Sequence, residues 1–355
     1  MQRRYPTRVT FLASLAGLWT ANACIPEFDE DLSLVEEPRI LAVRAEPAEV
    51  EEKEPVQLAA LVAVPQGGTT LTPVWAFCSA PKPLTELGPV AQPCIEDFGS
   101  TSPILKALGR GAAVDAVVPE NACRVFGPIP PDSAAGDPSR PVDPDDTGGF
   151  YQPVLAGTSD RDRTPSFGRV RVSCGLTGLA PDEARAYRLG YRRNENPAID
   201  ELVARVGAAR FEVDDGGSFA VEPGSEVSFE VSWTECPREA SCGDGVCSPG
   251  EERAACPEDC REPRGCAGAE TYAVFERESR SIGFRREGIT VAWYSDVGGF
   301  SVPENGVASS DPESTTEANR WRAPASERDS RLWIVLRDER GGVGFRSITA
   351  NVRDR

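Results

Sequence analysis

The sequence predicts an all-β protein made of two β-sandwich domains, the second of which carries a small disulfide-rich insertion. Apolar and polar residues alternate in several short segments, and the 355 residues include 33 glycines and 31 prolines. Alternation with a period of two places every second side chain on one face of a strand, and frequent turn formers between such strands are typical of sandwiches. Six of the 11 cysteines crowd into residues 236–266, which indicates the insertion.

The first sandwich is expected over residues 38–200. It begins with a strand at Pro38–Ala45 and continues with a second strand at Val56–Val62, whose alternate residues are apolar. A glycine turn then leads to Pro73–Cys78, a strand that contains Trp75. This succession of strand, turn, strand and Trp/Cys strand resembles the opening of immunoglobulin-like (Ig-like) and PKD-like modules in bacterial surface proteins, which implies an Ig-like sandwich.

The middle of the chain is less regular. Residues 126–149 are crowded with Pro, Gly and Asp, which predicts a long exposed loop. Strands are expected at Phe150–Val154 and Gly168–Cys174. Pro181–Tyr187 is expected to form a helix, because it has Pro in its first turn and acidic residues near its N-terminus. Residues 194–197 mark the end of the domain.

The second sandwich is expected over residues 201–355. Alternate residues from Val227 to Trp233 are apolar, which predicts a half-buried strand. Further strands are expected at residues 271–275, 289–294 and 331–336, the last apolar on both faces and therefore central in a sheet. Residues 336–352 are expected to form a hairpin around Gly341 and Gly342. This segment resembles the last hairpin of PKD-like and Ig-like modules.

Residues 1–23 have the features of a secretory signal: three arginines, a short apolar run and small residues before Cys24. Ala21-Asn22-Ala23-Cys24 resembles a bacterial lipobox, in which the cysteine is lipidated and becomes the first mature residue. The family usually has Leu where Ala21 stands, and ordinary signal-peptidase cleavage would leave Cys24 free or paired with another molecule. With lipidation, residues 24–37 form a flexible acidic tether, and the protein is expected at the cell envelope, on the outer membrane or the surface.

Lipidation of Cys24 leaves ten cysteines for five disulfides, which an exported chain can form. Four cysteines belong to the first domain and allow three pairings; Cys78 with Cys94 is favoured because it closes a short loop, which leaves Cys123 with Cys174. The other six allow 15 pairings. They are Cys236, Cys242, Cys247, Cys256, Cys260 and Cys266.

The cysteine-rich segment CGDGVCSPGEE…CPEDC resembles a small repeat of secreted and surface proteins from myxobacteria and related bacteria. The resemblance covers Cys242 to Cys260. The family often has a further cysteine soon after Gly-Glu, where this chain has Glu252-Arg253. Together with the lipobox and the sandwiches, the repeat implies an uncharacterised surface lipoprotein of the myxobacterial type, without a known activity.

Two metals can be considered for this insertion. Zinc requires four thiolates, which an oxidising compartment disfavours. Calcium prefers oxygen ligands, and Asp244, Glu251, Glu252 and Asp259 supply carboxylates on a glycine-punctuated loop. The spacing does not fit an EF-hand, and the alternative is a disulfide knot with solvated carboxylates. We therefore expect no cofactor, with calcium as the open alternative.

Composition limits the function. No histidine is present, which excludes Ser-His-Asp and Cys-His catalysis, and the net charge of −18 disfavours nucleic-acid binding. The sequence thus predicts a non-enzymatic, lipid-anchored binding or structural module whose partner, besides the membrane, is an envelope protein or a polysaccharide. A calcium-dependent adhesion protein is an alternative, and a glycosidase built on two carboxylates is a weaker one.

Carbohydrate binding is a further alternative, because tryptophan side chains stack on sugar rings. Trp321, in a turn-rich stretch, is the one expected to be exposed, whereas the others are expected in the core. The tryptophans considered are Trp75, Trp233, Trp293, Trp321 and Trp333.

Overall fold

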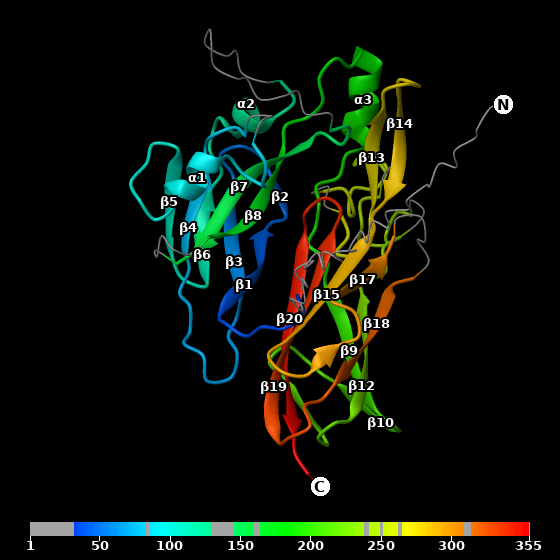
Figure 1. Cartoon of the computed structure of the whole chain (residues 1–355). Helices are drawn as coiled ribbons and strands as arrows, with labels where there is room; N and C mark the ends of the chain where they lie inside the picture. The colour runs from blue at the N-terminus through cyan, green and yellow to red at the C-terminus, as the bar shows by residue number, and fades with distance from the viewer. Residues whose placement is uncertain are drawn as a thin grey trace, which may run out of the picture. The chain divides into compact units, whose positions relative to one another are not determined.

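The computed structural model describes residues 32–82, 86–129, 145–158, 164–237, 241–248, 251–261, 265–308 and 314–354. Strands dominate these residues and pair into four sheets that form two sandwiches, with one separate hairpin (Figure 1). The all-β class with Ig-like sandwiches is therefore confirmed. The expected signal at residues 1–23, Cys24 and most of the tether lie outside the described residues. None of the described helices is both long and apolar enough to span a bilayer.

The first sandwich packs a three-stranded sheet against a five-stranded one. The smaller sheet has the order β1-β3-β6, with β1 at Arg39–Glu46, β3 at Pro55–Ala63 and β6 at Ala113–Val117. The larger has the order β2-β8-β7-β4-β5, at Glu49–Val50, Ser166–Ser173, Gly149–Gly157, Val74–Cys78 and Leu105–Arg110. The alternating apolar side chains of β3 and the aromatic residues of β4 meet in the core, which includes Leu58, Trp75 and Phe77.

The second sandwich contains two five-stranded sheets. One has the order β10-β9-β12-β18-β16, at Ala209–Glu212, Ile199–Val206, Glu226–Trp233, Thr316–Arg322 and Gly299–Phe300. The other has the order β11-β20-β19-β15-β17, at Ser218–Val221, Val343–Val352, Arg328–Asp338, Ile289–Ser295 and Glu304–Val307. As expected, the strand that is apolar on both faces, β19, lies inside its sheet between β15 and β20.

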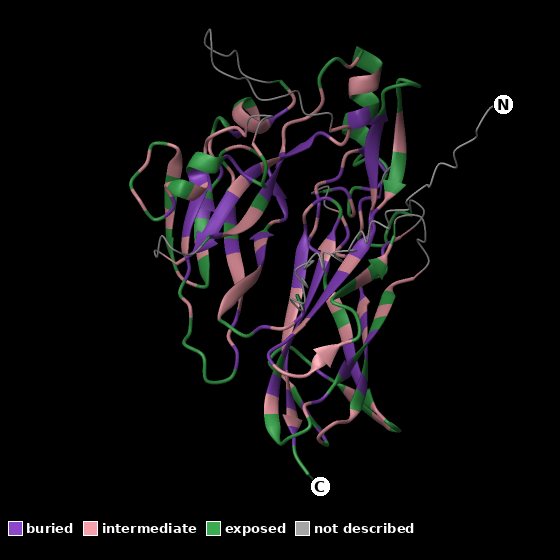
Figure 2. Cartoon of the chain, viewed as in Figure 1, coloured by how far each residue is buried: buried purple, intermediate pink, exposed green. Residues whose placement is uncertain are grey.

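The core of the second sandwich is aromatic. The rings of Phe229 and Phe300 lie 5.9 Å apart, and those of Trp293 and Phe300 lie 5.5 Å apart. Purple, buried residues run along the facing strands of both sandwiches in Figure 2. Trp321 belongs to this core and is 0% exposed, so the expectation that it lies exposed in a turn is wrong. The reason is the alternation of β18, which directs Asn319 and Trp321 inward.

Three short helices and one hairpin complete the described part of the chain. They are α1 at Gln92–Glu96, α2 at Ala122–Phe126, α3 at Pro181–Gly190, and the β13–β14 hairpin at Thr271–Glu276 and Ser281–Arg286. The expected helix is α3, which extends three residues beyond the predicted end. Its first turn is closed by the Glu183 carboxylate, which accepts the Ala180 N–H at 2.6 Å.

The structure contains five disulfides. Cys78–Cys94 and Cys123–Cys174 lie in the first sandwich, and this is the pairing that the sequence favours. The six clustered cysteines pair as Cys236–Cys266, Cys242–Cys256 and Cys247–Cys260. Cys236–Cys266 closes the base of the insertion between β12 and β13, and the other two disulfides cross-link its interior. Cross-links replace the apolar core that so short a segment cannot build.

Candidate functional site

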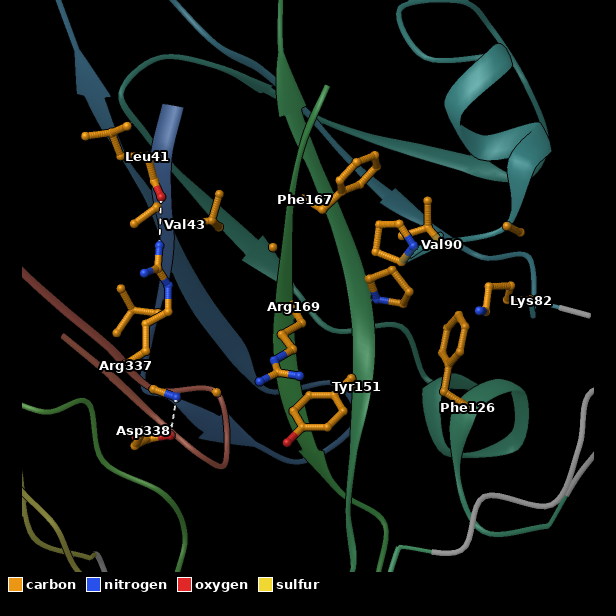
Figure 3. A pocket seen from close by; sticks show the side chains of 18 of the residues that line it. Leu41, Val43, Lys82, Val90, Phe126, Tyr151, Phe167, Arg169, Arg337 and Asp338 are labelled. Atoms are coloured by element: carbon orange, nitrogen blue, oxygen red, sulfur yellow. Dashed lines mark hydrogen bonds between the residues drawn. The ribbon is translucent and has the colours of Figure 1, made fainter. Parts of the chain in front are cut away.

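A cavity with a volume of about 560 Å³ lies where the turn between β19 and β20 meets the first sandwich (Figure 3). Its walls come from β1, α2, β7, β8 and residues 80, 82 and 89–91. The β19–β20 turn and its flanks contribute Arg337, Asp338, Gly341, Gly342 and Val343. A cavity of this size accommodates a small organic molecule.

Most of the wall is apolar. Leu41 and Val43 project from β1, Phe167 from β8 and Phe126 from α2, and Val90 adds a buried side chain beside them (Figure 3). On β1, the three consecutive residues Leu41, Ala42 and Val43 reach the cavity, at the point where a bulge shifts the register of β1 with β3 between Ile40 and Ala42. The pocket therefore offers an apolar surface to the body of a ligand.

Three cationic side chains line the same pocket. The Arg337 guanidinium donates a hydrogen bond to the Leu41 carbonyl at 2.9 Å, and the Lys82 ammonium donates one to the Gly88 carbonyl at 2.9 Å. Arg169 lies over the ring of Tyr151, with its guanidinium carbon 4.3 Å from the ring centroid. Within the described part of the chain, the Arg169 guanidinium has no hydrogen bond or ion pair. Its donors are therefore available to a bound anion.

The acidic contribution to the pocket is small. Among the described residues of its wall, Asp338 is the single acidic one, and it is 6% exposed. Its carboxyl group accepts hydrogen bonds from the Gly342 N–H at 2.8 Å and from the Asn194 amide at 3.1 Å. Burial raises the pKa of Asp338 above its usual range, although these hydrogen bonds act against the rise. The positive side chains therefore dominate the pocket.

Two glycines allow the walls to approach this closely. A Cβ at Gly168 in β8 would lie 2.5 Å from the side chain of Val43 in β1. Gly341, in the turn, has a φ of +98°, and a Cβ there would lie 2.8 Å from Nε of Arg169. The expected Gly-Gly turn is therefore also the part of the second sandwich that closes the pocket.

Behind this turn, a buried ionic network holds it in place. Arg340 is 3% exposed; its guanidinium pairs with the carboxylates of Glu270 and, at 2.7 Å, Glu287. The Arg340 guanidinium also donates to the main-chain carbonyl of Arg192 at 3.1 Å, and the Tyr151 hydroxyl donates to the main-chain carbonyl of Arg340 at 3.0 Å. Arg340 thus connects the turn to the β13–β14 region, to the connection between the sandwiches and to the pocket wall.

A second buried pair belongs to the same network. Arg171 Nε lies 3.1 Å from the Glu49 carboxylate, and neither side chain is more than 2% exposed. The Tyr191 hydroxyl and the Asn194 N–H also donate to this carboxylate. Burial by itself would raise the pKa of Glu49, but the charges of Arg171 and Arg340 outweigh it and hold the pKa below its usual range.

These contacts bear on the glycosidase alternative. A glycosidase needs two carboxyl groups that face one cleft, whereas the described lining of this pocket contains a single carboxyl group, that of Asp338. The described buried carboxylates of Glu49, Glu270 and Glu287 are bonded to arginines behind it. The arrangement can bind an anion, and it has the composition of a binding site.

The residues that the sequence singled out lie elsewhere. Cys24 is outside the described residues. Asp244, Glu251 and Asp259 come together in the insertion, with their nearest carboxylate oxygens within 4.8 Å of one another, whereas Glu252 is exposed and does not join them. The five tryptophans considered for sugar stacking are each at most 4% exposed and offer no stacking surface.

Sequence reasoning missed the pocket residues. They come from six separate segments, and the individual segments carry no motif. The one signal available was Gly341-Gly342, which predicted a turn but not what the turn contacts.

Comparisons with known proteins assign no family. No protein-family model matches the chain, and no curated protein matches its sequence. Among solved structures, fibronectin(III)-like modules of Clostridium thermocellum CbhA match with 8% identity and a TM-score of 0.19, over 88% of this chain and 94% of that chain. The Yersinia pseudotuberculosis adhesin InvE matches with 9% identity and a TM-score of 0.19, over 88% of this chain and 58% of that one.

The Escherichia coli alpha-2-macroglobulin matches with 10% identity and a TM-score of 0.19, over 90% of this chain and 22% of that chain. This chain therefore spans about a fifth of the macroglobulin and somewhat more than half of the adhesin.

Proposed function

We propose that this chain is a non-enzymatic, lipid-anchored binding protein of the cell envelope, and that its pocket binds an organic anion with an apolar body. The export signal and Cys24 support the location, and the five disulfides are compatible with an oxidising compartment. The pocket supports the binding function.

The observation that carries this proposal is the sign of the charge in the pocket. The chain has a net charge of −18, yet its pocket is lined by Lys82, Arg169 and Arg337 against one buried acid. An acidic protein that gathers cations around an apolar cavity concentrates anions there. Charge-assisted hydrogen bonds from Arg169 would hold the anionic group, and the apolar wall would hold the rest.

A titration of the mature chain with 8-anilinonaphthalene-1-sulfonate, an aromatic anion whose fluorescence rises in apolar sites, tests the proposal. We expect Arg169→Gln to weaken binding of this probe about tenfold, because a hydrogen bond to a charged group contributes about 1.5–3 kcal/mol. Arg169 is exposed, so the substitution leaves the core intact. Decanoate is expected to displace the probe.

Arg110→Gln is the matched control, because Arg110 is also an exposed strand arginine but is not part of the pocket lining. It should bind the probe as the unmodified chain does. Decanol, which has the same apolar chain without the charge, should displace the probe poorly. Equal affinities for Arg169→Gln and Arg110→Gln, or equal displacement by decanol and decanoate, would show that the pocket does not select anions.

A further inference from the structure

The cysteine-rich insertion brings three carboxylates together. Asp244, Glu251 and Asp259 each place one carboxylate oxygen within 4.8 Å of the other two. Two oxygens on opposite sides of a calcium ion, each about 2.4 Å from it, lie about 4.8 Å apart. The cluster therefore has the dimensions of a calcium coordination sphere.

Two disulfides fix this cluster. Asp244 lies between Cys242 and Cys247, Glu251 lies between Cys247 and Cys256, and Asp259 directly precedes Cys260. Because Cys242 is bonded to Cys256 and Cys247 to Cys260, the three acids are carried on loops that the cross-links hold together. The sulfur atoms are oxidised and are not available as thiolate ligands, so the carboxylates remain as the metal-binding groups.

Hydrogen bonds orient two of the carboxylates. Gly243 and Gly245, with φ values of +95° and +84°, form a turn around Asp244. Their N–H groups donate to Asp259 at 2.5 and 3.2 Å, and the Val246 N–H donates to Asp244 at 2.9 Å. Each carboxylate oxygen retains a second lone pair, so these bonds leave room for a cation.

The observation that points to a ligand is at Glu251. This residue is 6% exposed; its Oε2 accepts the Ser248 N–H at 3.1 Å, whereas its Oε1 is buried and has no hydrogen-bond partner among the residues that the structure describes. A buried carboxylate oxygen without a partner is unfavourable by several kcal/mol or more. Some group must compensate it, and a cation between the three acids would do so.

The neighbouring arginine does not provide this compensation by direct pairing. Arg192 directs its N–H groups to the main-chain carbonyls of Cys247, Ser248 and Glu251, at 2.5, 2.9 and 2.9 Å. It therefore holds the main chain of the loop in place while the Glu251 carboxylate remains directed toward Asp244 and Asp259.

We propose that Asp244, Glu251 and Asp259 form a calcium site that stabilises the insertion. Hard oxygen ligands favour calcium over softer metals, and carboxylates that bind through one or both oxygens supply three to six of the six to eight ligands that calcium takes. Water and main-chain carbonyls would complete the set. An affinity of about 10⁻⁴–10⁻³ M is expected, as in other extracellular modules.

Calorimetry with the mature, disulfide-bonded chain tests this proposal, with calcium chloride added after removal of metal by a chelator. We expect one calcium per chain, with magnesium at least tenfold weaker, and a melting temperature that rises in about 10 mM calcium, roughly ten times the upper limit of the expected dissociation constant. Glu251→Gln and Asp244→Asn should each weaken calcium binding at least tenfold.

Glu252→Gln is the matched control, because it removes the same charge one residue away at an exposed position outside the cluster. It should bind calcium as the unmodified chain does. Mass spectrometry of the disulfides shows whether each variant has folded, and Asp244 is exposed, so Asp244→Asn remains informative if Glu251→Gln does not fold. Absence of calcium binding, equal losses in Glu251→Gln and Glu252→Gln, or magnesium binding as tight as calcium would overturn the proposal.

Discussion

Asp338 illustrates how one buried acid affects both the pocket and the stability of the fold. It sits in the pocket wall, accepts hydrogen bonds from Gly342 and Asn194, and has a pKa that burial raises above its usual range. The folded chain therefore binds this proton more tightly than the unfolded chain, in which an Asp titrates at about pH 3.9. The protonated carboxyl group of Asp338 stabilises the fold fully below about pH 3.9, and this stabilisation is lost as the pH rises through the pKa that Asp338 has in the folded chain.

Asp338→Asn tests this dependence, because the amide has nearly the same shape and carries no charge at any pH. We expect the free energy of unfolding of the unmodified chain to fall relative to that of the variant as the pH increases from about 4. Urea unfolding at a series of pH values measures the difference. A difference that is the same at every pH would mean that Asp338 titrates alike in the folded and unfolded chains.

Trp321 shows where reasoning from single residues fails. Its neighbours Asn319, Arg320 and Arg322 are polar, which suggests a turn, yet the segment is strand β18. Asn319 also faces inward and satisfies its amide by donating to the Val302 carbonyl at 2.8 Å. Because Asn319 is polar but faces inward, the segment lacks the apolar-polar alternation that would predict a strand. Its hydrogen-bond partner, Val302, is distant in the chain and cannot be inferred from the sequence.

Strands β1 and β8 approach each other closely without a continuous ladder between them. The contact depends on Gly168, because a Cβ there would lie 2.5 Å from the Val43 side chain. We expect Gly168→Ala to lower the free energy of unfolding by about 1–3 kcal/mol, the usual effect of overpacking.

Val43→Ala provides the control for that interpretation. In a double-mutant cycle measured by urea unfolding, Gly168→Ala should be much less destabilising in the Val43→Ala background, because the smaller side chain makes room for the added methyl group. Additive losses would mean that the two strands do not constrain each other at this point.

The predictable strands were those with a clear pattern. Alternation located β3 and β12, and continuous apolar residues located β19. By contrast, β2 and β16 have two residues each, and β5 is largely exposed, so their apolar signal is weak. These strands are defined by their partners in the sheet rather than by their own composition.

For the whole molecule, the sequence indicated two sandwiches with a cross-linked insertion but not the contact between them. That contact depends on Arg340, which looks like an ordinary turn residue in the sequence Asp338-Glu339-Arg340-Gly341-Gly342. Its carboxylate partners, Glu270 and Glu287, are more than 50 residues away along the chain. A pocket assembled from six segments depends on such long-range contacts and carries no local signature.

Cys24→Ser tests the proposed attachment of the whole protein to the membrane. Lipid attached at this cysteine would hold the chain on a bilayer through buried methylene groups, each worth about 0.8 kcal/mol. We expect the unmodified chain to sediment with membranes after cell lysis and the Cys24→Ser chain to be soluble or to retain its signal. Membrane association that is unchanged and independent of acylation, as measured by mass spectrometry, would contradict the anchor.

The buried position of Arg340 also has a consequence for biosynthesis. A polypeptide is made from its N-terminus, so Glu270 and Glu287 are already present before Arg340, the cation that both pair with, leaves the ribosome. Until then, these acids lack the positive charge that permits their burial and must stay hydrated. The junction therefore closes only after Arg340 has emerged, and the two earlier acids stay in contact with water until then.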